Sequence, residues 1–178
     1  DYGLPENAFV FCCFNNSYKI GKREFAIWMR LLEKVSGSVL WLLKSNKWAM
    51  ENLKNEAEHY RIDPSRIIFA ELAHHKDHLA RHRHADLFID TFNYNAHTTA
   101  SDALKSGLPV VTKQGQQFPA RVASSLLKAV SLTELITYTE DEYENLALNL
   151  ALNKDQLMKI KSQLTINLHN QPLFDTKK

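Results

Sequence analysis

Short apolar segments of strand length recur along this chain and are separated by segments with helical periodicity. Residues 9–14 read Phe-Val-Phe-Cys-Cys-Phe, which is apolar throughout, as expected for a strand covered on both faces. The further predicted strands are residues 39–43, 66–70, 85–90 and 108–112, and residues 132–136 form a short final strand or a turn. This alternation is the strongest constraint on the fold.

Helical periodicity fills the intervals between these strands. One helix begins near Lys22 and stops at Ser36, with Phe25, Trp28 and Leu32 on one apolar face. The other predicted helices are residues 48–60, 75–84, 100–106, 119–130, 140–152 and 154–168. Such alternation is typical of parallel βαβ units, whose right-handed crossovers cover both faces of a sheet. We therefore predict one α/β domain over residues 1–178, with a doubly wound, mainly parallel, Rossmann-like sheet and C-terminal helices from about residue 140.

The composition suits such a domain and excludes several classes of function. Of the 178 residues, 44% are hydrophobic and 24% are charged, which allows a sizeable core. A net charge of +2 is too small to indicate nucleic-acid binding, which usually needs a concentrated basic face. No segment reaches the roughly 18 apolar residues of a membrane span, so we expect no membrane partner.

The two cysteines indicate the cellular location of the protein, and the first residue indicates its relation to a longer chain. Cys12 and Cys13 are neighbours in a predicted strand, so their side chains point to opposite faces and no disulfide between them is expected. Buried free thiols are typical of a reduced, cytoplasmic protein. The chain opens with Asp1 rather than Met, and we expect it to be a piece of a longer protein.

The polar segment from Asp90 to Asp102 joins the predicted fourth strand to the next helix. It brings His97, Thr98 and Thr99 to the helix start, where unpaired amides and the helix dipole favour a phosphate. The pattern Thr99-x-x-Asp102 also fits a capping box, in which both side chains only satisfy orphan amides. Both interpretations use the same amides, and this segment alone does not separate them.

Polar side chains also follow the other predicted strands, and parallel strands bring them to one edge of the sheet. These residues are Asn15, Asn16, Ser17 and Lys19, then His74, His75 and His78, and finally Gln114, Gln116 and Gln117. This weakly cationic rim suits a nucleotide or another phosphate ester. The dinucleotide fingerprint Gly-x-Gly-x-x-Gly and the P-loop are both absent, so neither an NAD-dependent oxidoreductase nor an NTPase is expected.

Histidine spacing leaves two interpretations of the segment after the third strand. His74, His78 and His82 are four residues apart, and that spacing on a helix can hold zinc. No cysteine or carboxylate accompanies them at a recognisable spacing, so we favour a solvated or ligand-facing helix without metal. On such a helix His78 can stack on a base.

Two cations are further candidates for contact with an anion. Lys19, just past the first strand, can reach a diphosphate as a point charge or can be an ordinary surface lysine. Arg121 falls in the first turn of its helix, where a cation opposes the dipole unless an anion lies close by.

Taken together and in order, these motifs resemble the C-terminal lobe of the catalytic region of the O-linked N-acetylglucosamine transferase family, which also includes SPINDLY-type fucosyltransferases. The resemblance covers nearly the whole chain. The segments that carry it are Phe-Asn-Asn-Ser-Tyr-Lys-Ile (14–20), Ser-Val-Leu-Trp-Leu-Leu (38–43), Arg-Ile-Ile-Phe (66–69), His78 with Arg81, residues 90–102, Gly-Leu-Pro-Val-Val-Thr (107–112) and residues 172–177.

The resemblance implies a GT-B fold, with the sugar nucleotide held mostly by this lobe, and it assigns roles to site residues. Lys19 would contact the donor diphosphate and stabilise the departing nucleotide, and Asn16 stands where the family has a glutamine on the same phosphates. His78 would stack on uracil, and Arg81 would shape that pocket. His97, Thr98 and Thr99 would bind the diphosphate, and Asp102 would bind the ribose hydroxyls. His75 would contact the base, at a position where the family has a lysine.

The implied activity is inverting transfer of N-acetylglucosamine from UDP-GlcNAc to protein Ser or Thr, without a metal ion. The His-Thr-Thr segment followed by Asp102 is closer to the N-acetylglucosamine branch than to the fucosyl branch. The acceptor protein would bind through upstream regions, including tetratricopeptide repeats, and the isolated chain would be inactive. The alternatives are a transferase that uses GDP-fucose or UDP-glucose and a non-catalytic nucleotide-binding or interaction lobe.

Overall fold

The computed structural model describes residues 2–170, and the part of the resemblance over residues 172–177 lies outside them. The described chain forms a six-stranded, all-parallel sheet with the strand order β3-β2-β1-β4-β5-β6. The strands are β1 (Val10–Cys13), β2 (Val39–Leu43), β3 (Ile67–Ala70), β4 (Leu87–Ile89), β5 (Val110–Lys113) and β6 (Ile136–Thr137). The predicted doubly wound, Rossmann-like α/β fold is confirmed.

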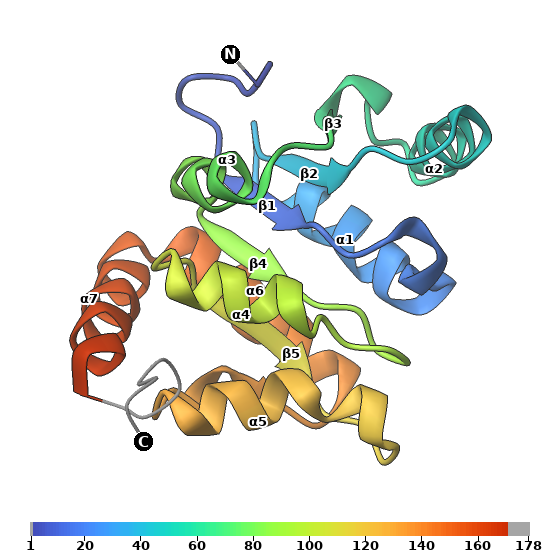
Figure 1. The fold of residues 1–178 in the computed structure, drawn as a ribbon. Helices are drawn as coiled ribbons and strands as arrows, with labels where there is room; N and C mark the ends of the chain where they lie inside the picture. Colours follow the sequence, from blue (N-terminus) through green and yellow to red (C-terminus); the bar gives the residue numbers. More distant parts are fainter. Residues whose placement is uncertain (1, 171–178) are drawn as a thin grey trace.

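Helices cover both faces of this sheet (Figure 1). They are α1 (Lys22–Lys34), α2 (Lys47–His59), α3 (His75–Arg81), α4 (Thr98–Lys105), α5 (Val122–Ala129), α6 (Glu140–Leu152) and α7 (Lys154–Asn170). On one face α1 packs against α6, and on the other α4 packs against α5. Helices on both faces explain why the strands are apolar without alternation.

Several predicted boundaries shift because short 3₁₀ helices take up residues that we assigned to strands, to longer helices or to the loops between them. These are η1 (Ser17–Lys19), η2 (Pro64–Arg66), η3 (His82–His84), η4 (Phe118–Ala120) and η5 (Thr133–Leu135). Thus Arg66 precedes β3, and the predicted last strand divides into η5 and β6. The helix predicted from residue 100 begins two residues earlier, at Thr98, which changes the interpretation of the site.

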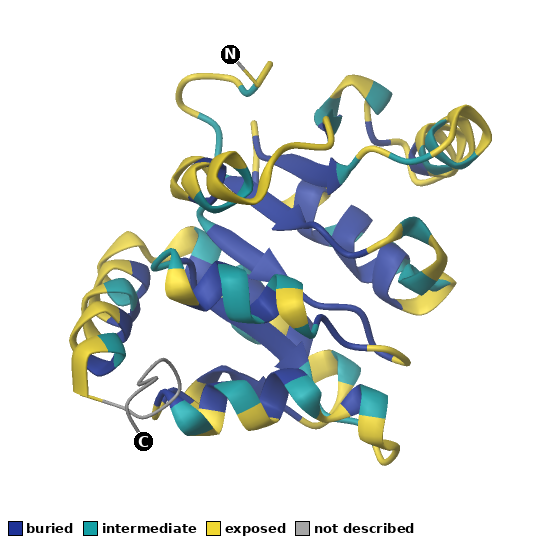
Figure 2. Cartoon of the chain, viewed as in Figure 1, coloured by how far each residue is buried: buried dark blue, intermediate teal, exposed yellow. Residues whose placement is uncertain are grey.

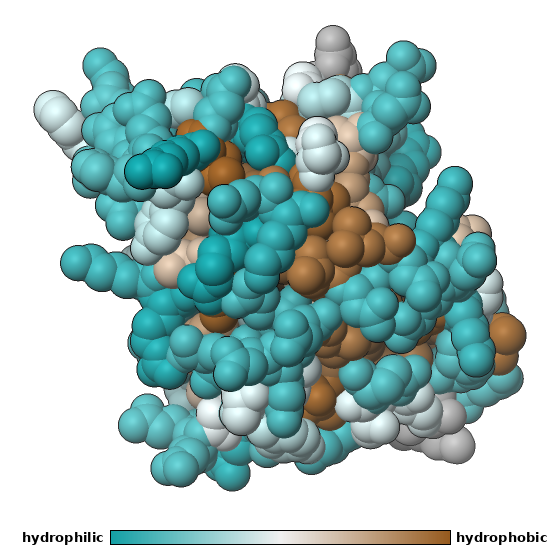
Figure 3. Space-filling view, turned by 180° about the vertical axis from the view of Figure 1, so that it is seen from behind, coloured by the Kyte–Doolittle hydropathy of each residue, from teal (hydrophilic) through white to brown (hydrophobic). Residues whose placement is uncertain are grey.

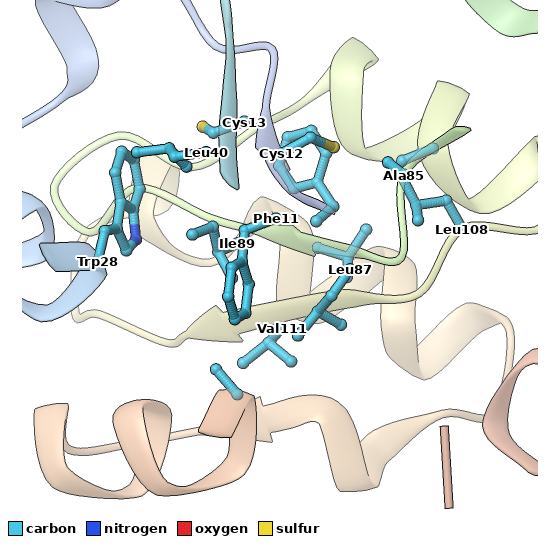
Figure 4. Close-up of a cluster of buried hydrophobic side chains, with 14 of the residues drawn as sticks. Phe11, Cys12, Cys13, Trp28, Leu40, Ala85, Leu87, Ile89, Leu108 and Val111 are labelled. Atoms are coloured by element: carbon cyan, nitrogen blue, oxygen red, sulfur yellow. The ribbon is translucent and has the colours of Figure 1, made fainter. Parts of the chain in front are cut away.

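The core lies on both faces of β1, β2, β4 and β5 (Figure 2). Strands β1 and β4 are buried throughout, and β2 and β5 are buried except for their last residues. Figure 4 shows Phe11, Leu87, Ile89 and Val111 on the same face of the sheet. Cys12 and Cys13 are buried and free, and burial raises the pKa of both thiols. They are therefore inert core residues.

One connection ties the α1–α6 layer to the sheet, and a second joins the two helices of the layer. Trp28 Nε1 donates to the Tyr143 hydroxyl at 3.0 Å, and that hydroxyl donates to the backbone oxygen of Asp90 at 3.0 Å. At the outer side of the layer, Glu144 accepts from Arg30 Nη2 at 2.6 Å and from Lys34 Nζ at 2.8 Å. The first connection supports the carboxyl end of β4, where the candidate site begins.

The surface is mixed in character. Seen from behind, apolar side chains gather near the middle of the molecule and are surrounded by hydrophilic ones (Figure 3). Among the described residues, every helix is too short or too polar to cross a membrane.

Candidate functional site

The site lies at the carboxyl edge of the sheet, where the strand order reverses between β1 and β4. Chain segments that leave adjacent strands in opposite directions open a crevice at such a point. The loop after β1 carries Asn15, Asn16 and Lys19, and the loop after β4 runs from Asp90 to His97, the residue before α4. Both loops are joined by hydrogen bonds, so their side chains belong to one site.

Lys19 lies directly against the loop after β4. Its Nζ donates to the backbone oxygen of Asn95 at 3.3 Å and lies 4.0 Å from the centre of the Tyr94 ring. The Tyr94 ring in turn stacks on His97, with 4.8 Å between ring centres. Burial lowers the pKa of Lys19, and the nearby Asp90 carboxylate partly offsets this effect. Lys19 and His97 therefore both contact the Tyr94 ring, which places them in the same part of the site.

The N-terminus of α4 has no side-chain cap. His97 occupies the N-cap position and makes no capping hydrogen bond, while its Nε2 lies 3.3 Å from the Pro119 oxygen. The predicted capping box of Thr99 and Asp102 is wrong, because the helix begins at Thr98 and the Thr99 hydroxyl donates to Asn15 Oδ1 at 2.7 Å. Without a capping side chain, the first-turn amides remain suited to an anion.

A second group of side chains lies one turn further along α4. His78 Nε2 and His75 Nδ1 lie 3.9 Å and 4.0 Å from Asp102 Oδ2. His78 is mostly enclosed, with 14% of its side chain exposed, whereas 67% of the His75 side chain is exposed. The geometry therefore brings His75, His78 and Asp102 together, with His78 as the ordered ring and His75 at the rim.

Arg81 determines the tautomer of His78. The buried guanidinium lies 4.4 Å from the centre of the Phe14 ring, donates to the Glu71 oxygen at 2.6 Å and places Nη2 2.5 Å from His78 Nδ1. Arginine only donates, so Nδ1 accepts and the imidazole proton is on Nε2. Burial, and then the Arg81 charge, lower the pKa of His78 to about 4, so a neutral ring faces Asp102.

The zinc interpretation of the histidines does not agree with this geometry. The His82 ring is fully buried, and its Nδ1 lies 2.7 Å from the His78 backbone oxygen. Within residues 2–170, no three His, Cys, Asp or Glu side chains are arranged to hold a metal ion.

The remaining predicted rim residues are more dispersed. Asn16 is exposed and lines a cleft of about 400 Å³ with Ser17, Lys44 and Glu71. Arg121 is the N-cap residue of α5 and lines a separate cleft of about 300 Å³ with Gln114 and Lys128. Thr98 is exposed at the start of α4.

Asp90 and Asn15 are central to this site. The sequence placed Asn15 on the polar rim and Asp90 at the end of a strand, but it assigned neither residue a specific contact. Asp90 is completely buried and accepts from Thr91 N at 2.8 Å, Ala96 N at 2.7 Å, the Thr112 hydroxyl at 2.7 Å and Asn15 Nδ2 at 3.3 Å. Burial raises the pKa of Asp90 to about 7, although these four donors act in the opposite direction. A carboxylate directly after an apolar strand was the available signal, because buried charges need partners.

A solved structure with a similar fold defines the class of the protein. An O-GlcNAc transferase mutant from Thermobaculum terrenum superposes with a TM-score of 0.88 and 27% sequence identity, covering 97% of this chain and 35% of that one. The chain is therefore a Rossmann-like lobe of the GT-B glycosyltransferase type. Residues 1–178 match the profile of glycosyl transferase family 41, and the chain belongs to that family.

Two curated relatives cover almost all of this chain. It is 37% identical over 177 residues to the probable UDP-N-acetylglucosamine–peptide N-acetylglucosaminyltransferase SEC of Arabidopsis thaliana, with 99% of this chain covered. It is 36% identical over 176 residues to the UDP-N-acetylglucosamine–peptide N-acetylglucosaminyltransferase of Caenorhabditis elegans, again with 99% covered. The chain spans only 18% and 15% of the lengths of these two proteins.

Proposed function

We propose that this chain is the donor-binding lobe of an inverting glycosyltransferase that moves N-acetylglucosamine from UDP-GlcNAc to protein Ser or Thr. The observation that carries the proposal is the position of Lys19, against the loop that leads into the uncapped N-terminus of α4. A cation and a helix N-terminus on one crevice suit a diphosphate. The relatives named for this reaction support the choice of donor.

The proposed chemistry uses that pair of positive groups. The acceptor hydroxyl attacks the anomeric carbon and releases its proton to the solvent. The bond from that carbon to the diphosphate breaks, and its electron pair remains on the leaving phosphate oxygen. The charge on this oxygen increases in the transition state, so Lys19 and the α4 amides stabilise the transition state more than the ground state. We propose that these groups supply the positive charge and that the reaction proceeds without a metal ion.

The second group of side chains is proposed to hold the nucleoside. His78, kept neutral and oriented by Arg81, presents its ring for stacking on uracil. Asp102 accepts from the ribose hydroxyls, and His75 lies at the base edge as an exposed contact. On the phosphate side, His97, Thr98 and Thr99 contribute the start of α4, and Asn16 contributes an exposed amide.

The acceptor protein is proposed to bind through regions outside this chain, since the curated relatives are several times longer. The tetratricopeptide repeats of the parent protein and its cytoplasmic location stay predictions. We expect the 178-residue chain alone to bind the nucleotide weakly and to transfer no sugar.

Calorimetric titration of this chain with UDP, GDP and UDP-GlcNAc tests the proposed function. UDP should bind at least about tenfold more tightly than GDP, equivalent to about 1.4 kcal/mol. Asp102→Asn should weaken UDP binding, whereas Asp155→Asn on the distant helix α7 should not. Preference for GDP would overturn the donor assignment, and absence of nucleotide binding would favour a non-catalytic interaction lobe.

A further inference from the structure

The side chain of Asn15 is enclosed between the two loops of the site and is only 2% exposed. Its Nδ2 donates to Thr91 Oγ1 at 2.7 Å, and its Oδ1 accepts from the Thr99 hydroxyl at 2.7 Å. Thr91 donates its own proton to the Tyr94 oxygen at 2.6 Å, so toward Asn15 it can only accept. The orientation of the Asn15 amide is therefore determined by its neighbours.

In this orientation the Thr99 hydroxyl donates its hydrogen bond to Asn15 and not to a ligand. The hydroxyl has one proton, and that proton points to Asn15 Oδ1. Toward a bound anion, Thr99 then offers its backbone amide, while exposed Thr98 keeps a free hydroxyl at the same helix end. The two adjacent threonines thus differ in what they can donate to a ligand.

The same amide also links the loop that carries Lys19 to the facing loop after β4. Asn15 begins the short loop that leads through η1 to Lys19, and it binds Thr91 at the start of the facing loop. Lys19 Nζ meets that facing loop again at Asn95, near its other end. The two loops are therefore joined at two places, at Asn15–Thr91 and at Lys19–Asn95. Asp90 supports the first of these contacts by accepting a hydrogen bond from Asn15 Nδ2.

We propose that Asn15 is a positioning residue that holds Lys19 and the N-terminus of α4 in fixed relation by engaging the Thr99 hydroxyl. The inference rests on the proposed function for its effect on catalysis. Asn15 touches no reacting atom, and it acts through Thr99, Thr91 and Lys19. Thr98 supplies the hydroxyl that contacts the donor phosphates.

A double-mutant cycle on UDP affinity separates the two threonines. Asn15→Ala and Thr99→Val should each weaken UDP binding by roughly threefold to tenfold, and the double variant should be no weaker than the worse single variant. Thr98→Val combined with Asn15→Ala should instead give the product of the two losses. Thr99→Ser, which keeps the hydroxyl, should restore the affinity that Thr99→Val loses. Independent, multiplying losses for Asn15→Ala and Thr99→Val would overturn the proposal.

A readout without nucleotide tests the connection to Lys19 and does not depend on the proposed function. The Lys19 ammonium lies over the Tyr94 ring, so the ring current should shift the proton signals of the neighbouring methylene upfield in NMR spectra. Asn15→Ala should remove this shift, Thr99→Val should reduce it, and Thr99→Ser should retain it. An unchanged Lys19 signal in Asn15→Ala would overturn the proposal, whether or not UDP binds. If Asn15→Ala does not fold, an unchanged Lys19 signal in Thr99→Val would overturn it instead.

Discussion

Replacement of Lys19 by alanine in the full-length protein should lower kcat by roughly 10²–10³-fold, the loss typical when one preorganised donor to a developing oxyanion is removed. UDP affinity should fall by much less. Lys19 lies beside the loop that leads to α4, where we place the diphosphate, and its interaction strengthens as negative charge accumulates on the leaving oxygen. Steady-state kinetics with UDP-GlcNAc, together with UDP titration, separates the two quantities.

The control for this experiment is Lys105→Ala, which removes an exposed lysine from the opposite end of α4. This variant keeps wild-type kcat and affinity if the effect of Lys19 depends on its position rather than on net charge. An equal loss of kcat and UDP affinity in Lys19→Ala would instead show that the lysine only binds the ground state.

Asp90→Ala should lower the free energy of unfolding by about 3–5 kcal/mol, because it removes the acceptor shared by several buried donors. These donors include the backbone amides of Thr91 and Ala96, which bond to Oδ1 at 2.8 Å and 2.7 Å. Urea denaturation measures the loss, with exposed Asp77→Ala as the control expected to stay within about 0.5 kcal/mol. A small loss for Asp90→Ala would show that the loop after β4 does not depend on this carboxylate.

Asp90→Asn should give a pH-dependent difference from the wild type. Burial raises the pKa of Asp90 to about 7 in the folded protein, above its ordinary value of 3.8. Between these values the folded state holds more protons than the unfolded state, so the contribution of Asp90 to stability falls as pH rises. The free energy of unfolding of Asp90→Asn relative to the wild type should therefore rise from pH 4 to about 7 and then level off, and a constant difference would contradict the raised pKa.

The sequence was sufficient for the sheet and for most of the residues that meet at its edge. An unbroken apolar run such as residues 9–14 predicts a strand covered on both faces, and β1 lies within that range. Polar residues after such strands converge because parallel strands end at one edge, which is why Lys19 and His97 are found together. Neither conclusion requires knowledge of individual side-chain contacts.

The errors and omissions share a physical cause, since they depend on contacts between residues far apart in the chain. The Thr-x-x-Asp pattern suggested a capping box, but Asn15, from the other side of the switch point, takes the Thr99 hydroxyl. Likewise, the role of Asp90 was missed because its partners Asn15 and Thr112 are 75 and 22 residues away in the chain. Local patterns list the groups that are able to interact, and tertiary packing selects among them.

A crystal structure of this chain with UDP bound is the most direct measurement of whether the strand-end loops form one diphosphate site. We predict the diphosphate between Lys19 Nζ and the first-turn amides of α4, with the Thr98 hydroxyl in hydrogen-bond range and uracil against the His78 ring. A diphosphate bound away from Lys19, or at another edge of the sheet, would contradict the proposed role of this lobe.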